Sequence, residues 1–206
     1  MPIFQDRIHG HFDERITTLG KIKARSLGAD SLTLTALNVL VYAQLEGGIK
    51  DLASCVLRDL NLRHMTVGEI RPDILKWRNP DEIDRFRAMV DFEMIAKMSP
   101  FAPNLGKRLK VKAINRRAEL NQMSWEAITR IYRGLGLDPK EIEPLKTRID
   151  EIVDDRNAAA HHGSLLGVAV AFMEQHVRDN VLAVEAVLTD FSLQLLPFFI
   201  NRQHAR

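Results

Sequence analysis

The sequence is almost without cysteine: Cys55 is the only one among 206 residues. A single thiol excludes an internal disulfide framework and argues against a cysteine-based zinc site. A chain without disulfides suits a reducing compartment. The N-terminal segment 1–10 is polar and lacks the apolar stretch of a secretory signal. We therefore expect a cytoplasmic protein.

Long apolar runs are absent as well. The longest apolar region, Leu32–Leu45, falls short of the about 20 residues that a membrane-spanning helix needs. It is also interrupted by polar residues, namely Thr33, Thr35, Asn38 and Gln44. No membrane association is expected, and the 46% of hydrophobic residues are enough to build a globular core. The formal net charge of +2 is too small to demonstrate nucleic-acid binding, although it does not oppose it.

Signals for strands and for several common enzyme classes are also missing. The sequence has no sustained alternation of apolar and polar residues and no hairpin dipeptide between apolar runs. It has no internal repeat, no glycine-rich phosphate loop and no G-x-S-x-G elbow. Nearly every periodic segment follows the helical repeat instead. We therefore predict one all-α domain over residues 1–206, a helical bundle with two long helices and shorter inserted helices.

Apolar side chains recur at helical spacing in three segments that we expect to form the core. In the first helix they are Ile8, Phe12, Ile16, Leu19 and Ile22. The second helix starts at a cap on Asp30 or Ser31, ends near Asn61, and carries Leu34, Leu37, Val41, Leu45, Leu52 and Val56. The last helix spans about 167–196 and carries Val170, Met173, Val177, Val181, Val184 and Leu188. Gly47 and Gly48 would let another backbone approach the second helix closely, and Pro197 would kink or end the last one.

Residues 63–136 are predicted to be a partly inserted helical region. Asn79-Pro80 indicates the start of a helix to about residue 98, and Ser124 indicates the N-cap of a helix over 125–133. Between them lies the most basic segment of the chain, which contains Lys107, Arg108, Lys110, Lys112, Arg116 and Arg117. This basic segment is either a solvated surface or a site that helps to hold RNA phosphates.

The helix that ends at Gly163 carries unusual chemistry. Its apolar stripe consists of Leu145, Ile149, Ile152 and Val153, and Arg156 and Ala160 continue the same stripe. An arginine therefore stands where the pattern favours a leucine, and no acid lies three or four residues away to pair with it. Asn157 and His161 share a neighbouring face because they are four residues apart. Gly163 suits the left-handed C-cap of this helix.

This sequence pattern resembles the motif of the HEPN superfamily, specifically of the branch that contains the RiboL-PSP-HEPN and HEPN nuclease-like toxin domains. Its signature is Arg-x4–6-His near the end of a helix, and here it reads Arg156-Asn157-Ala-Ala-Ala-His161. Tyr42-Ala-Gln-Leu-Glu46-Gly-Gly-Ile-Lys50 resembles the second-helix segment of that branch, and Leu135-Gly-Leu-Asp138 its approach to the motif. The likeness extends from about Leu32 to Phe199. His162 departs from the family pattern, which usually has glycine there, so both histidines stay candidates; the register favours His161.

The resemblance implies a metal-independent endoribonuclease with Arg156, Asn157 and His161, or His162, at its catalytic centre. Cleavage beside a ribose 2′-hydroxyl needs a base and an acid, which histidine supplies near neutral pH, and a fixed cation, which arginine supplies. One Arg and one His are too few for both proton transfers, so the resemblance implies a homodimer with facing motif helices. It also implies an RNA substrate, no cofactor and no metal, and a toxin or phage-defence effector restrained by an antitoxin or immunity partner.

Other interpretations of the same residues remain open. Arg156 could pair with a core acid such as Glu46, or Glu46 could support Arg156 from behind without touching the substrate. His161 could interact only with the dipole at the helix C-terminus. The chain could then be a non-catalytic HEPN module that binds protein or RNA. A helical ligand-binding or regulatory protein is a third alternative, and it would have an enclosed apolar pocket far from Arg156.

Overall fold

The computed structural model describes residues 2–64, 70–79, 111–112, 123–163 and 168–200, and among these residues it contains helices and no strand. The helices are α1 (Pro2–Arg25), α2 (Ser31–Leu62), α3 (Pro72–Arg78), α6 (Trp125–Gly134), the 3-10 helix η2 (Lys140–Leu145), α7 (Lys146–His162) and α8 (Val170–Ile200). The prediction of an all-α bundle is confirmed. The two longest helices are α2 and α8, with 32 and 31 residues, and α1 adds a third long helix of 24 residues.

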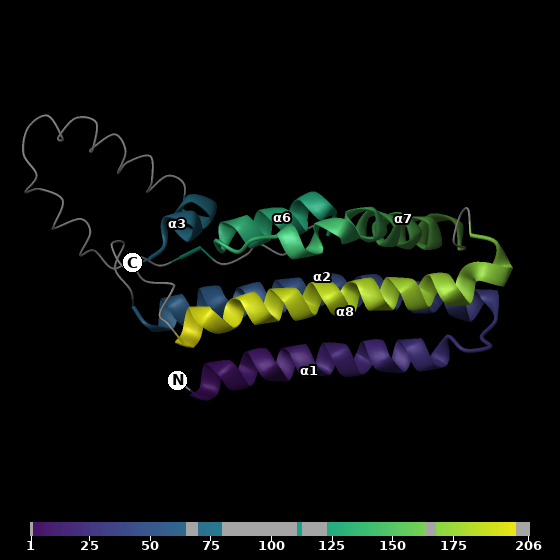
Figure 1. Cartoon of the computed structure of the whole chain (residues 1–206), viewed down its shortest axis with the longest axis horizontal. Helices are drawn as coiled ribbons and strands as arrows, with labels where there is room; N and C mark the ends of the chain where they lie inside the picture. The colour runs from purple at the N-terminus through teal and green to yellow at the C-terminus, as the bar shows by residue number, and fades with distance from the viewer. Residues whose placement is uncertain (1, 65–69, 80–110, 113–122, 164–167, 201–206) are drawn as a thin grey trace, which may run out of the picture.

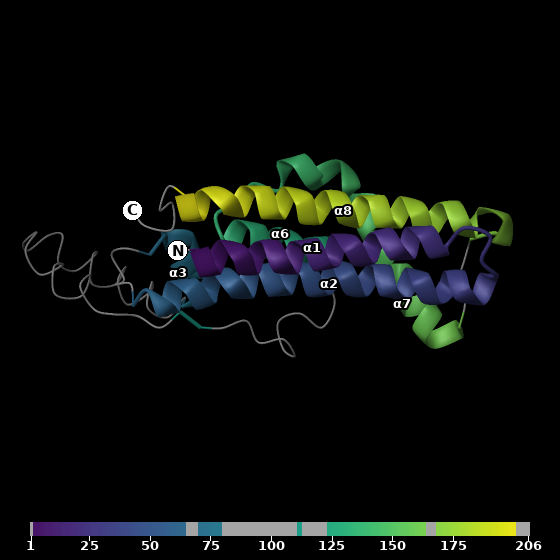
Figure 2. The same ribbon diagram turned by 90° about the horizontal axis from the view of Figure 1, so that it is seen from below.

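The helices are arranged in layers along one long axis (Figure 1). The long helices α1, α2 and α8 run side by side, and each packs against the other two. A second layer of α3, α6 and α7 covers α2 and α8 on the side away from α1 (Figures 1 and 2). Within this layer, α7 packs against both α2 and α8. The motif helix is therefore held by the two central helices of the bundle.

The core lies where the predicted apolar stripes meet. Fully buried side chains come from α2, α7 and α8, among them Leu45, Ile49, Leu52, Ile149, Ile152, Val181, Val184 and Leu188. The predicted stripe of α1 is buried at Ile8, Leu19 and Ile22, while Phe12 and Ile16 are partly buried. Val170 is an exception, because it is the first residue of α8 and is exposed.

Two predicted helix caps are confirmed. The Asp30 carboxylate accepts a hydrogen bond from the Thr33 N–H at 2.7 Å, and this bond lowers the pKa of Asp30. The Ser124 hydroxyl accepts from the Ala127 N–H at 3.4 Å and caps α6. Each cap satisfies a backbone donor that the first turn of a helix leaves without a partner.

Pro144 and Pro197 both lie inside helices. The sequence favours Pro144 as the start of the motif helix, but Pro144 lies in η2 and α7 begins two residues later at Lys146. Of the two alternatives predicted for Pro197, an end of the last helix is wrong, since α8 continues to Ile200. A proline in the last turn removes only one backbone hydrogen bond, so a helix that is anchored along the rest of its length tolerates it.

Most of the predicted inserted region lies outside the described residues. This holds for the helix expected from Asn79-Pro80 to about residue 98 and for all of the basic segment except Lys112. The described parts of the region include α3 and α6, which pack against each other. The assignment of 63–136 as an insertion stays a prediction.

The two adjacent glycines of α2 face different neighbours. A Cβ atom at Gly48 would lie 2.5 Å from Leu188 Cδ2 of α8, and one at Gly47 would lie 2.8 Å from the Arg15 guanidinium. The structure differs from the predicted approach of another backbone, because the atoms nearest to both Cβ positions belong to side chains of α8 and α1. Gly48 allows α2 and α8 to pack at the centre of the bundle.

Replacing Gly48 with alanine should therefore destabilise the fold. The added methyl group overlaps a buried leucine, so we expect a loss of about 1–3 kcal/mol in the free energy of unfolding. The matched control is Gly20→Ala in α1, where nothing lies within 4 Å of the new Cβ and a gain of about 0.4–1 kcal/mol is expected. Urea unfolding of both variants measures the difference, and equal stability of the two would contradict this packing.

Candidate functional site

The Arg–His motif occupies the last two turns of α7. Arg156 and Asn157 are half-buried, and His161 and His162 are exposed. The helix ends at Gly163 with φ of 69°, and its N–H donates to the Ala159 carbonyl at 3.0 Å. This confirms the predicted left-handed C-cap. Ala160, which was assigned to the apolar stripe, is exposed, and the partly buried Ala159 beside it packs against the core instead.

Arg156 contacts an aromatic ring of the neighbouring helix. Its Cζ atom lies 5.5 Å from the ring centroid of Tyr42 in α2, and its Nη1 donates to Asn157 Oδ1 at 3.1 Å. It forms no ion pair with any residue that the structure describes. A cation over a tyrosine face gains about 0.5–2 kcal/mol while keeping its full charge. The arginine on the apolar stripe is therefore packed without being neutralised.

Tyr42 is itself held firmly. It is buried, and its hydroxyl accepts a hydrogen bond from the Met123 N–H at 3.0 Å. Burial raises the pKa of Tyr42, and the negative charge and hydrogen bonding of Glu46 raise this pKa further, while the charge of Arg156 lowers it. The phenol therefore stays protonated at neutral pH and keeps a fixed ring under the guanidinium.

Glu46 is not paired with Arg156. Its carboxylate forms an ion pair with Lys50, one turn further along α2. The negative charge of this carboxylate raises the pKa of Tyr42, whose ring lies beside Arg156. Support of Arg156 by Glu46 stays a prediction, and it would act in two steps: Glu46 would orient Tyr42, and the Tyr42 ring would support Arg156.

The two histidines are open to solvent on the last turn of α7. Their ring centroids lie 6.5 Å apart with an edge-on orientation, and neither ring is hydrogen-bonded to a described residue. Both imidazoles can therefore reach a ligand that approaches from outside. His161 follows Asn157 by one turn, whereas His162 points about 100° away from His161 around the helix.

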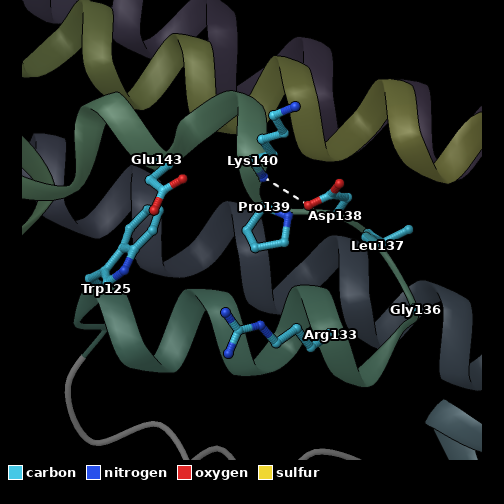
Figure 3. Close-up of a pocket in the computed structure, with 8 residues that line it drawn as sticks. All are labelled: Trp125, Arg133, Gly136, Leu137, Asp138, Pro139, Lys140 and Glu143. Atoms are coloured by element: carbon cyan, nitrogen blue, oxygen red, sulfur yellow. Dashed lines mark hydrogen bonds between the residues drawn. The ribbon is translucent and has the colours of Figure 1, made fainter.

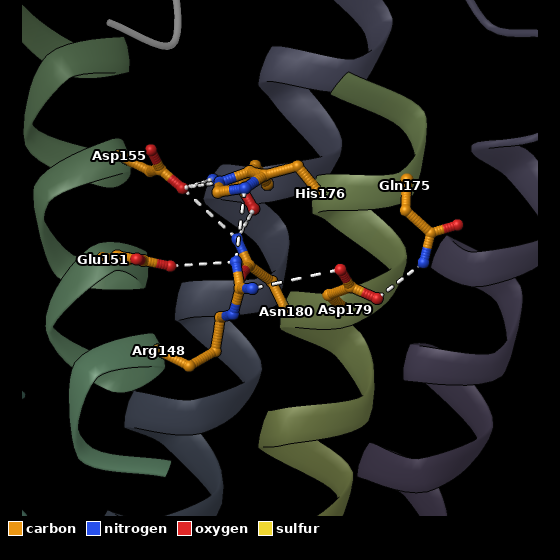
Figure 4. A network of polar contacts seen from close by, with 8 residues as sticks. Arg148, Glu151, Asp155, Gln175, His176, Asp179 and Asn180 are labelled. Carbon is orange, nitrogen blue, oxygen red and sulfur yellow. Dashed lines mark hydrogen bonds and ion pairs between the residues drawn. The ribbon is translucent and has the colours of Figure 1, made fainter. Parts of the chain in front are cut away.

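A buried polar cluster next to the motif was not predicted from the sequence. Asp155, which directly precedes Arg156, accepts hydrogen bonds from Asn38 of α2 and from His176 and Asn180 of α8 (Figure 4). The signal that could have found it is the presence of Asn38 and Asn180 at positions that the apolar periodicity assigns to the core. Both are fully buried.

Lys112 is the one member of the basic segment within the described residues, and it is exposed. The adjacent Val111 is bound at the end of α2, where its N–H and C=O pair with the Asn61 side chain at 2.8 and 3.0 Å. Along a helix with a rise of about 1.5 Å per residue, Asn61 lies about 28 Å from Tyr42. The structure thus places Lys112 far from Arg156 of the same chain.

Two surface pockets lie away from the motif. One, of about 500 Å³, is lined by Trp125, Arg133, Gly136, Leu137, Asp138, Pro139, Lys140 and Glu143 (Figure 3). The other, of about 480 Å³, is lined by Pro144, Leu145, Thr147, Arg148, Glu151, Asp179, Leu182 and Ala183. Charged side chains line both, unlike the apolar pocket that a helical ligand-binding protein would need.

Among the residues that the structure describes, no helix is long and apolar enough to cross a membrane. Within the same residues, no three His, Cys, Asp or Glu side chains come together as a group that could hold a metal ion.

Comparison with known proteins gives one match. The sequence model of the RiboL-PSP-HEPN family matches residues 21–196, which include α2, α7 and nearly all of α8. No curated protein and no solved structure matches the chain significantly.

Proposed function

Because the chain belongs to the RiboL-PSP-HEPN family, we propose that it is a metal-independent endoribonuclease with its catalytic centre at the end of α7. HEPN domains are associated with nuclease or RNA-related functions, and they often dimerise and bind RNA. The observation that carries the proposal is the state of Arg156. It is a packed, half-buried guanidinium with no ion-pair partner among the described residues; it is hydrogen-bonded to Asn157, and two exposed imidazoles follow in the last turn of the same helix.

The proposed reaction is an internal transfer of the RNA phosphate. A histidine base removes the proton of the 2′-hydroxyl, and the 2′-oxygen attacks the adjacent phosphorus. The bond from phosphorus to the 5′-oxygen breaks, and a histidine acid protonates that oxygen as it leaves. The products are a 2′,3′-cyclic phosphate and a 5′-hydroxyl, and no atom is gained or lost. Arg156 stabilises the extra negative charge of the phosphorane, for which its planar donor fork is suited.

Asn157 supports the arginine in this scheme. Its Oδ1 accepts from Arg156, so its Nδ2 remains to donate to a phosphate oxygen or to His161. Tyr42 holds the other side of the guanidinium. Arg156 therefore needs little reorganisation when the phosphate binds, which favours electrostatic stabilisation of the transition state.

A two-fold homodimer would complete the centre. One protomer contributes one Arg156 and one His161, and a partner with its motif helix opposite supplies the second pair. Apolar side chains are available for such an interface: Leu32 and Leu40 of α2 and Phe172 of α8 are 73%, 46% and 68% exposed. We propose that RNA enters between the two motif helices. Lys112 and the rest of the basic segment would contact phosphates further along the strand.

The proposed biological role is that of a toxin or phage-defence effector. A nuclease with exposed catalytic histidines needs control in its own cell, so an antitoxin or immunity protein is the proposed partner. Occlusion of the end of α7 would be the simplest form of such control.

The purified protein should cleave RNA in the presence of EDTA. We expect single-stranded RNA pools to be cut, and the same sequences with 2′-O-methyl groups to stay intact, because methylation removes the attacking nucleophile. Denaturing gel electrophoresis of both substrates, with and without EDTA, measures this.

Cleavage that disappears with EDTA, or that persists on the methylated strand, would refute the proposed chemistry. An intact RNA pool together with retained dimerisation would instead favour a non-catalytic HEPN module. The folded state of the sample is checked in each case by its thermal unfolding transition.

A further inference from the structure

Asp155 is a buried carboxylate on the motif helix, one residue before Arg156. It is 7% exposed and accepts hydrogen bonds from three donors on two other helices (Figure 4). The donors are Asn38 Nδ2 at 2.9 Å, His176 Nε2 at 2.6 Å and Asn180 Nδ2 at 3.3 Å. The Asn180 amide also donates to Asn38 Oδ1 at 2.8 Å, which joins α2 to α8 directly beneath α7.

The tautomer of His176 follows from its neighbours. A carboxylate only accepts, so Nε2 carries the proton that faces Asp155. Nδ1 lies 3.4 Å from Arg148 Nη1 and is placed to accept from a guanidinium, which only donates. Arg148 is balanced by Glu151 at 2.9 Å and by Asp179 at 3.9 Å. The cluster therefore runs as one chain of donors and acceptors from the protein surface to Asp155.

Asp155 is the last buried residue of α7. The buried residues of this helix are Ile149, Ile152, Val153 and Asp155, and none of the following residues, through Gly163, is buried. Apolar contacts of Ile149, Ile152 and Val153 fix the first part of α7 against the core, and after Asp155 only the partly buried Ala159 continues this packing. A charged group inside the protein is strongly disfavoured unless it is hydrogen-bonded, so the helix is held in the one rotation that satisfies Asp155.

We propose that Asp155, held by His176, Asn38 and Asn180, is the positioning residue that fixes Arg156 and His161 for catalysis. The proposal rests on the proposed ribonuclease function of the same helix. Asp155 does not touch the substrate. Its contacts on α2 and α8 set the rotation of α7, so that Arg156 meets the Tyr42 ring and the last turn presents the histidines to solvent. Catalytic rates are sensitive to such placement, because a misplacement of about 1 Å can lower a rate by about 100-fold.

The test compares Asp155→Asn with Asp154→Asn. Both changes remove one negative charge from α7, but Asp154 is exposed and belongs to no such cluster. In Asp155→Asn we expect kcat for RNA cleavage to fall by about 10- to 100-fold with little change in KM, because positioning acts on the transition state. We also expect hydrogen exchange at the backbone amides of 157–163 to accelerate by about tenfold, because the last turns lose their anchor. Asp154→Asn should behave like the unchanged protein in both measurements.

A second pair of variants tests the histidine and covers the case in which Asp155→Asn does not fold. His176→Gln keeps an N–H donor that can reach Asp155, and it should retain most of the rate. His176→Leu removes the donor, and it should reproduce the loss in kcat and the faster exchange at 157–163. If glutamine restores the rate and leucine does not, the hydrogen bond to Asp155 matters and not only the volume of the side chain at position 176.

Three outcomes would overturn the proposal. One is an Asp155→Asn protein whose kcat for RNA cleavage and whose hydrogen exchange at 157–163 equal those of Asp154→Asn. Another is an Asp155→Asn protein that loses activity only in proportion to its unfolded fraction, while hydrogen exchange at the amides of 157–163 stays unchanged. The third is equal behaviour of His176→Gln and His176→Leu. If the unchanged protein cleaves no RNA, the proposed function fails, and the exchange data alone then decide whether Asp155 positions the end of α7.

Discussion

Replacing Arg156 with alanine should lower the rate of RNA cleavage by about 100- to 1,000-fold, the usual effect of removing a preorganised donor from a developing negative charge. The fold should persist, because Arg156 is only half-buried and its contact with the Tyr42 ring contributes about 0.5–2 kcal/mol. Arg156→Lys should recover only part of the rate, since an ammonium keeps the charge but loses the planar fork and the stacking on Tyr42. Single-turnover cleavage of a labelled RNA measures all three proteins.

Arg178→Ala is the matched control for this experiment. Arg178 lies on α8, pairs with Glu174 at 3.8 Å, and is as charged as Arg156. Its loss changes the net charge by the same amount, so any general effect of charge on RNA binding appears in both variants. Equal losses in the two variants would mean that Arg156 contributes only charge, and full activity of Arg156→Ala would remove it from the catalytic centre.

Replacing His161 with alanine should lower the cleavage rate by about 100- to 10,000-fold, the range of general acid–base catalysis. His162→Ala should have a much smaller effect. His161 lies one helical turn after Asn157 and shares its face, whereas His162 is turned about 100° away. Both are exposed and next to each other, so the pair of variants is closely matched in position, size and solvent contact.

The rates of the two histidine variants are measured with the same RNA, and their unfolding temperatures are compared first. A large loss in His162→Ala with retained activity in His161→Ala would reverse the assignment. Retained activity in both single variants would show that neither imidazole transfers a proton in the slow step, and the centre would then have to be sought elsewhere on the protein.

The structure gives a specific answer to the question of how an arginine is kept on an apolar helix face. Arg156 contacts the ring of Tyr42, and it forms no ion pair with any acidic residue that the structure describes. An acid in direct contact would neutralise the guanidinium and compete with a phosphate for its donors. A buried tyrosine whose hydroxyl accepts a hydrogen bond from the Met123 backbone instead gives an uncharged support. Arg156 is in this way packed and still available to an anion.

The helices and their caps could be predicted because their signals are local. Asp30, Ser124 and Gly163 each act on backbone groups within four residues, and the structure shows all three caps. The lack of an acidic partner for Arg156 within its own helix could also be predicted, because it depends only on the residues three and four positions away.

The contacts that shape the site could not be predicted because they join distant parts of the chain. Asn38 and Asp155 are 117 residues apart in the sequence, and Asn38 and Asn180 are 142 apart. A buried asparagine in an apolar stripe indicates that some partner exists, but periodicity within one helix carries no information about which residue of another helix meets it. The same holds for Tyr42, whose pattern position predicts burial and not the guanidinium above its ring.

The end groups of the RNA fragments made in EDTA distinguish attack by the 2′-oxygen from attack by water. We predict fragments that end in a 2′,3′-cyclic phosphate and begin with a 5′-hydroxyl, since the 2′-oxygen is the nucleophile and histidine protonates the leaving 5′-oxygen. Mass spectrometry of the fragments from a short RNA distinguishes these ends from their alternatives. Fragments with 3′-hydroxyl and 5′-phosphate ends would require water as the nucleophile and would contradict the assignment of the reaction to Arg156 and His161.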